Sequence, residues 1–193
     1  MEGACWHTAT KMTAEKVRRE IEIPEKVDAS VKDSILVISG QKGSVERNLR
    51  NKKVSVKVDG SKIVLEAERN TKREKKLLGT FSAHIKNMIQ GVIAGHVYRM
   101  KICSGHFPMN VSVSNKELLV KNFLGEKVPR RVKVPDGVSI KIEGSEITIE
   151  SPDKEKAGGT ASAIEEGTKR KGFDKRIFQD GIFITEKDGK RIK

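Results

Sequence analysis

The sequence has 193 residues, with 39 lysines and arginines against 26 acids, which gives a formal net charge of +13. This excess predicts a polyanionic partner, with nucleic acid the first candidate and a membrane surface the rival. No apolar run approaches the roughly 18 residues that a membrane-spanning helix needs, and the two cysteines, Cys5 and Cys103, are too few for a disulfide framework and fit a reducing, cytosolic compartment.

The first segment, residues 1–11, reads MEGACWHTATK and has no periodic pattern. It carries an acid, Glu2, and no long apolar run, so it does not resemble a secretory signal. Cys5 and His7 stand alone, and two ligands cannot fill a tetrahedral metal site. Met12 opens a more ordinary beginning, MTAEKVRREIEIP. We expect translation to start at Met12, and a native peptide spanning Cys5 to His7 would contradict this.

The most informative feature is a near-repeat of the chain. Residues 56–67 read VKVDGSKIVLEA and residues 140–151 read IKIEGSEITIES. Downstream, GTFSAHI at residues 79–85 matches GTASAIE at residues 159–165. In both copies an acid-Gly-Ser turn separates two strands, because glycine tolerates the positive φ of a tight hairpin. Each copy therefore predicts several short strands followed by one helix.

The repeat predicts an α+β fold of two tandem duplicated small domains, each a mostly antiparallel sheet with one packed helix. We expect the first repeat over residues 12–95 and the second over residues 96–172. A basic C-terminal tail follows over residues 173–193. Aromatic residues make up only 4% of the chain, so the cores must be aliphatic and thin.

The helix of the first repeat is well marked. Thr71 is its expected cap, with Glu74 at capping-box spacing. Steps of three and four residues give one apolar face, formed by Leu78, Phe81, Ile85, Met88 and Val92. Its opening turns carry Lys72, Arg73, Lys75 and Lys76. Cations oppose the helix macrodipole there, so a solvated face and an external partner are equally good explanations.

A strand is predicted in the stretch NFLGEKVPRRVKVPDG, residues 122–137, because its second half alternates between valines and polar residues. The valines at 128, 132 and 134 would form the inner face. The polar positions carry one sign of charge, and they are Lys127, Arg130, Arg131 and Lys133, with Lys121 nearby. The matching stretch of the first repeat, about residues 40–54, includes Glu46, so the second copy is the more cationic.

The second helix is predicted to begin with Ser151 as its cap and Pro152 at its first position. Its apolar stripe is weak, because Gly158 and Gly159 interrupt it, so it should lie close to its sheet or be less stable.

A third basic cluster follows at residues 169–176, with the cations Lys169, Arg170, Lys171, Lys175 and Arg176. Phe173 and Phe178 interleave with them, as in surfaces that combine phosphate contacts with base stacking. Arginine grips phosphate oxygens with two donors, and no recognition helix for DNA is evident, so the pattern favours folded RNA.

Catalytic motifs are missing from the sequence. There is no phosphate-binding P-loop, no dinucleotide fingerprint, no G-x-S-x-G elbow and no metal-ligand spacing of His or Cys. His84 and Cys103 are best explained as structural residues. We therefore predict no catalytic site, metal or cofactor.

Three separated stretches resemble large-subunit ribosomal protein six in its archaeal and eukaryotic form. They are GTFSAHIKNMIQGV at residues 79–92, NFLGEKVPRRVKVPDGV at residues 122–138 and KGFDKRIFQDGIFI at residues 171–184. The resemblance covers about residues 20–187, in the expected order over a duplicated chain. It implies two similar α+β domains and a structural, non-catalytic component of the large ribosomal subunit.

The resemblance also implies binding to large-subunit (23S-type) ribosomal RNA near the stalk base and the factor-binding region, in the cytoplasm. Neighbouring large-subunit proteins are implied as further partners, with no membrane and no small-molecule substrate. Matched by motif, RNA contact falls on Lys127, Arg130, Arg131, Lys171, Lys175 and Arg176. The charge clusters add Lys121, Lys133, Lys169 and Arg170.

Two alternatives remain open at this point. The chain could be a general RNA-binding protein that acts off the ribosome, in which case unrelated RNAs would bind as tightly as ribosomal RNA at matched salt. It could also be an enzyme with a dispersed site, which activity in an RNA-free sample would reveal.

Overall fold

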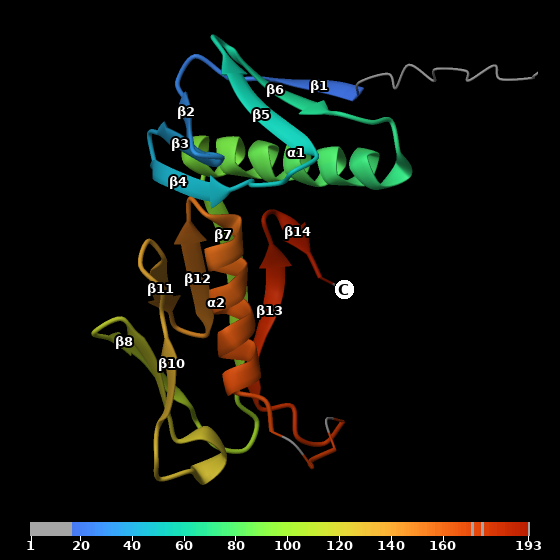
Figure 1. Ribbon diagram of the computed structural model, residues 1–193. Coiled ribbons are helices and arrows are strands. Elements are labelled where there is room, and N and C mark those ends of the chain that lie inside the picture. The colour runs from blue at the N-terminus through green and yellow to red at the C-terminus, as the bar shows by residue number, and fades with distance from the viewer. Residues whose placement is uncertain (1–16, 171, 175, 193) are drawn as a thin grey trace, which may run out of the picture.

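The computed structural model describes residues 17–170, 172–174 and 176–192. Within them the chain forms two units, one above the other in Figure 1. The first unit runs from β1 to α1 and the second from β7 to β14. The proposed leader, residues 1–11, and the proposed start at Met12 lie outside the described residues.

The first unit contains two three-stranded antiparallel sheets and one long helix. One sheet has the order β1-β6-β5 and the other β2-β3-β4. Its elements are β1 (Val17–Glu22), β2 (Asp28–Lys32), β3 (Ile35–Gly40), β4 (Gly43–Asn48), β5 (Val54–Asp59), β6 (Lys62–Ala67) and α1 (Lys72–Ile93).

The second unit repeats this plan and extends it. Its sheets have the orders β10-β9-β8 and β11-β12-β7-β13-β14. Its elements are β7 (His96–Cys103), β8 (Asn110–Ser114), β9 (Glu117–Lys121), the 3-10 turn η1 (Phe123–Gly125), β10 (Arg130–Lys133), β11 (Ser139–Glu143), β12 (Glu146–Ser151), α2 (Lys154–Gly167), β13 (Gly181–Lys187) and β14 (Lys190–Arg191).

The strand orders confirm the α+β class and the duplication. β6 lies between β1 and β5 just as β12 lies between β7 and β11. One detail differs from the prediction, because each unit has two sheets rather than one. The basic C-terminal tail also contributes a strand to the second unit, since β13 pairs with β7 inside the larger sheet. An aliphatic strand completes a sheet here, which the basic composition of the segment conceals.

Local signals explain the ends of the helices. Thr71 caps α1 as predicted, since its hydroxyl accepts a hydrogen bond from the Glu74 N–H at 3.3 Å. The cap of α2 is Asp153, which accepts from the Glu155 N–H, and the prediction of Ser151 is wrong. Ser151 instead ends β12 and donates its hydroxyl to the Gly137 carbonyl.

The turns and the close packing of α2 also match the sequence. Gly60 and Gly144 adopt φ values of 58° and 60° in the predicted hairpins. A Cβ added at Gly158 would lie 3.1 Å from the Tyr98 hydroxyl, so glycine lets α2 approach β7 closely. Each unit has its own aliphatic core, centred on residues such as Ile38 and Leu78 in the first and Met100 and Ile149 in the second.

A built junction joins the two units. Buried His96 directs Nε2 at the Asn87 carbonyl and Nδ1 at the Asp188 carboxylate, both at 3.0 Å. Lys154 lies 3.3 Å from the same carboxylate. Burial opposes ionisation of Asp188, but His96 and Lys154 outweigh it and hold its pKa below the ordinary value. Gly91 of α1 packs so closely against Pro152 that no Cβ fits between them.

Candidate nucleic-acid interface

The outer face of the sheet β8–β9–β10 carries part of the predicted basic surface. Arg131 and Lys133 are exposed on this face, and Lys121 is exposed at the end of β9. They take part in none of the ion pairs formed within the described residues. The face is less uniform than predicted, because Glu117 of β9 lies opposite Lys133.

The predicted strand is shorter than the alternating sequence. Regular pairing covers only Arg130–Lys133, where Val132 is buried. Val128 precedes the strand and is 77% exposed, so its assignment to the inner face is wrong. Lys127 is exposed in the same turn.

Arg130 is not an exposed strand cation, in contrast to the prediction. Its Nε and one terminal nitrogen donate to the two carboxylate oxygens of Glu126 at 2.8 and 2.7 Å. The other terminal nitrogen donates to the Gly167 carbonyl at 2.8 Å, and the guanidinium lies 4.1 Å from the centre of the Phe123 ring. The arginine therefore caps the C-terminus of α2, where a cation complements the helix dipole.

This contact brings two predicted clusters together. Gly167 is the last residue of α2, and Lys169 and Arg170 come directly after the next residue, Thr168. Hydrogen bonds from Arg130 hold the pKa of Glu126 below its ordinary value, and the charge of Arg170 adds to the effect. The start of β10 and the start of the C-terminal basic segment therefore lie next to each other.

Aromatic side chains order this segment. Arg170 lies over the Phe173 ring at 4.3 Å, Phe173 meets Phe178 edge-on at 4.8 Å, and Phe178 stacks on His106 at 4.9 Å. Such contacts each contribute about 0.5–1.5 kcal/mol beyond burial. The predicted interleaving of cations with phenylalanines is present, but the rings mostly contact the protein itself.

A buried carboxylate anchors the far end of the segment. Asp180 accepts hydrogen bonds from the Gly105 and His106 N–H groups at 2.5 and 3.1 Å and lies 2.6 Å from the His106 ring nitrogen Nδ1. Burial opposes its ionisation, but these bonds outweigh burial and hold its pKa below the ordinary value. No sequence signal connects residues so far apart in the chain.

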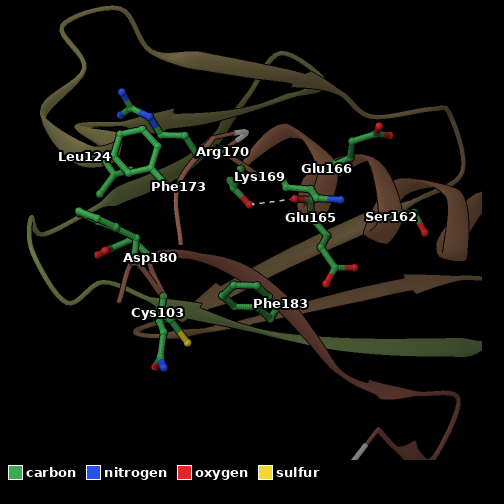
Figure 2. Close-up of a pocket in the computed structure, with 13 residues that line it drawn as sticks. Cys103, Leu124, Ser162, Glu165, Glu166, Lys169, Arg170, Phe173, Asp180 and Phe183 are labelled. Carbon is green, nitrogen blue, oxygen red and sulfur yellow. Dashed lines mark hydrogen bonds between the residues drawn. The ribbon is translucent and has the colours of Figure 1, made fainter. Parts of the chain in front are cut away.

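Between the segment and α2 lies a pocket of about 690 Å³ (Figure 2). Phe173, Leu124 and Arg170 gather along one side of it, and Phe183 and Cys103 along another. Glu165 and Glu166 of α2 also line the pocket, so its charge is mixed. The exposed cations around it, rather than its interior, form the positive surface.

The remaining predicted contacts differ in state. Lys169 is exposed and takes part in no ion pair within the described part of the chain. Arg176 is exposed but donates to Asp174 at 2.9 Å, which raises the pKa of the guanidinium. Lys171 and Lys175 lie outside the described residues.

A second basic surface was only partly predicted. The turn before β5 lies beside the turn before α1, because the Glu68 N–H donates to the Lys53 carbonyl at 3.4 Å. The two turns bring together exposed cations, and these are Arg50, Lys52, Lys53, Arg69, Lys72, Arg73, Lys75 and Lys76. Since the two turns meet only through the pairing of β5 with β6, the sequence alone revealed just the helical half of the group.

Neither a metal centre nor a membrane helix was found in the parts of the chain that the structure covers. Residues 17–170, 172–174 and 176–192 hold no group of three or more His, Cys, Asp or Glu side chains that could bind a metal. No helix among these residues is long and apolar enough to cross a membrane.

The comparisons with known proteins match this geometry. The family model described as Ribosomal protein L6 matches residues 23–95 and 107–181. The large ribosomal subunit protein uL6 of Nanoarchaeum equitans is 47% identical over 184 residues, which cover 91% of this chain and 96% of the relative. The proteins of the same name from Methanosarcina mazei and Haloarcula marismortui are 43% and 42% identical, over 89% and 88% of this chain and 98% and 96% of each relative. The duplicated α+β chain therefore belongs to the ribosomal protein L6 family.

Proposed function

We propose that this protein is a structural component of the large ribosomal subunit and that it binds large-subunit ribosomal RNA mainly through its second unit. The relatives that it matches over nearly their whole length are named as large ribosomal subunit proteins, and the family is not one of enzymes. The protein is then located in the cytoplasm, as part of the ribosome. We further propose that the contact lies near the stalk base and the factor-binding region, with neighbouring subunit proteins close by.

One observation supports the RNA contact above the others. Two basic segments of the second unit meet at the end of α2 and present exposed cations without ion pairs among the described residues. They are Lys121, Lys127, Arg131, Lys133 and Lys169. Unpaired cations suit a phosphate backbone, since each phosphate they neutralise releases a counterion.

The geometry favours recognition of backbone and shape over base sequence. The cations lie on a sheet face and in turns. The end of α2 that meets this surface is its C-terminus, where Arg130 caps the Gly167 carbonyl, so α2 does not present base-reading side chains there. Such a surface can follow phosphates of folded RNA without entering a groove.

The experiment is sedimentation of native extracts through sucrose gradients at rising salt. We expect the protein in the large-subunit fraction at low and moderate salt. Binding of the purified protein to large-subunit RNA should weaken linearly in log–log form as salt rises. Recovery only in the free-protein fraction would contradict the proposal, and equal affinity for unrelated RNAs at matched salt would favour a general RNA-binding protein instead.

A further inference from the structure

Among the residues that the structure describes, the first unit leaves open a sheet edge that the second unit covers. Within the described residues β1 pairs only with β6, whereas β7 pairs with both β12 and β13. The two strands are equivalent, because Ile23 and Ile102 donate their N–H groups to Ser61 and Ser145 in the same way, each at 2.8 Å. The free side of β1 therefore corresponds to the side of β7 that β13 occupies.

The second unit shows what this position accepts. Ile182 and Ile184 of β13 lie opposite Ile102 and Met100 of β7. Ile182 is fully buried, and its N–H donates to the Thr168 hydroxyl just beyond α2 at 3.1 Å. The position thus takes an extended segment with aliphatic residues at alternate places.

The order of elements explains why the first unit lacks this strand. The strand after α2 is β13, which returns to its own sheet (Figure 1). The strand after α1 is β7, which has crossed over to become a central strand of the second unit. No strand in the described part of the first unit therefore takes, on β1, the place that β13 takes on β7.

A groove of about 710 Å³ lies at this place, between the end of β1 and the last turns of α1. Its floor is aliphatic, with Ile21, Ile23, Ile89 and the 37%-exposed Ile93. Because Ile21 and Ile23 bond toward β6, the alternation of an antiparallel ladder directs the N–H and C=O of Glu20 and Glu22 outward. The groove thus offers both backbone partners and an apolar floor.

The charged side chains along the edge of β1 indicate which kind of strand could pair with it. On β7 the outward residue opposite Glu186 is Arg99, and the two form an ion pair at 3.4 Å. The equivalent positions of β1 carry acids, Glu20 and Glu22. Glu20 already lies 3.2 Å from Arg18 and 3.3 Å from Lys62, whereas Glu22 takes part in no ion pair within the described residues. Opposite charges on neighbouring strands stabilise their pairing, so a strand bound here would carry Lys or Arg next to Glu22.

We propose that this groove binds an extended segment of a neighbouring protein, which adds a strand to β1. The segment has aliphatic residues at alternate positions and Lys or Arg facing Glu22. This is β-strand addition, in which main-chain hydrogen bonds give affinity and alternate side chains give specificity. The choice of a neighbour within the large subunit rests on the proposed function.

The test is photo-cross-linking in intact large subunits, with a benzophenone amino acid at one position of the full-length chain. Glu22 and Ile93 probe the groove, and Lys133 on the RNA-facing sheet is the matched control. We expect the groove positions to cross-link to a protein and Lys133 to RNA. Sequencing of the cross-linked peptide should show alternating aliphatic residues with Lys or Arg, and the backbone amides of residues 18–22 should exchange at least about tenfold more slowly in subunits than in the free chain.

The control separates the two proposals. Suppose that all variants sediment with subunits and that the variant at Lys133 cross-links to RNA. Any of three results at Glu22 and Ile93 would then contradict the strand-addition proposal. These are cross-links to RNA, cross-links within the chain to residues 1–16, or no cross-link with unchanged amide exchange. If the variants do not enter subunits, the proposed function fails first.

Discussion

At the scale of single residues, neighbouring arginines have different roles. Arg130 holds Glu126, Gly167 and Phe123 together, whereas Arg131 is exposed on the opposite face of β10. We expect Arg130→Ala to lower the free energy of unfolding by about 2–3 kcal/mol, because it removes charge-assisted hydrogen bonds and leaves Glu126 without its partner. Denaturant unfolding measures this change.

Arg131→Ala is the matched variant. Its effect on stability should stay within about 0.5 kcal/mol, while the slope of log affinity against log salt for ribosomal RNA falls by about 1. If both variants were equally stable, the structural role of Arg130 would be wrong.

Asp180 makes the stability of the fold depend on pH in the acidic range. Its carboxylate is stabilised by Gly105 and His106 against the cost of burial, so its folded pKa lies below the ordinary value. A depressed carboxylate contributes stability above its unfolded pKa of about 3.9 and loses it as pH falls through the folded pKa. Asp180→Asn should lower the melting temperature at pH 7. Between pH 5 and pH 3, the melting temperature of this variant should fall less than that of the native protein. A wild-type acid dependence in this variant would contradict the assignment.

Residue roles were predictable where the signal is local. Thr71 and Gly60 follow from capping and turn rules that involve a few neighbours. The inward position of Arg130 depends on η1, where Asn122 and Leu124 adopt positive φ values of 59° and 46° and turn Phe123 into the core. Asparagine tolerates this conformation, but nothing in the sequence marks Leu124 for it, so the turn was missed and the arginine was assigned to the surface.

At the scale of elements, β13 is part of the core and not an appendage. A chain that ends at Asp180 loses Ile182 and Ile184 from the second unit, and burial of each aliphatic side chain contributes about 1.5–3 kcal/mol. We expect this truncation to unfold the second unit or make it aggregate through the uncovered edge of β7. Hydrogen exchange of the β7 amides reports the loss.

A chain that ends at Gly189 is the control, because it removes β14 while keeping β13 and Asp188. Its amide protection should stay close to that of the full chain. Near-native protection of β7 in the shorter truncation would show that the tail serves only as an RNA contact.

Elements with strong periodicity were predictable, and their partners were not. The helices and the last hairpin of each unit follow from spacing of apolar residues and glycine turns. The division into two sheets per unit depends on long-range pairing, such as that of β12 with β7. The lysines and arginines before β13 placed it in a basic C-terminal tail, and its pairing with β7 depends on residues far away in the sequence.

At the scale of the whole molecule, the units should unfold together through their junction. Gly91→Ala would place a Cβ onto the Pro152 carbonyl and 3.0 Å from the His96 ring, so the junction must shift. Overpacking of this kind costs about 1–3 kcal/mol. We expect calorimetry of this variant to show two separated transitions.

Gly159→Ala is the control, because nothing lies within 4 Å and alanine favours the helix by about 1 kcal/mol. A single, unshifted transition in Gly91→Ala would contradict a tight junction.

The most direct test of the central proposal is a map of ultraviolet protein–RNA cross-links in native large subunits. We predict that cross-links to large-subunit RNA concentrate in the second unit, at Lys121, Lys127, Arg131, Lys133, Lys169 and Arg170, with Arg130 absent because it is held by Glu126 and Gly167. Cross-links confined to the first unit, or none in subunits that contain the protein, would contradict the account.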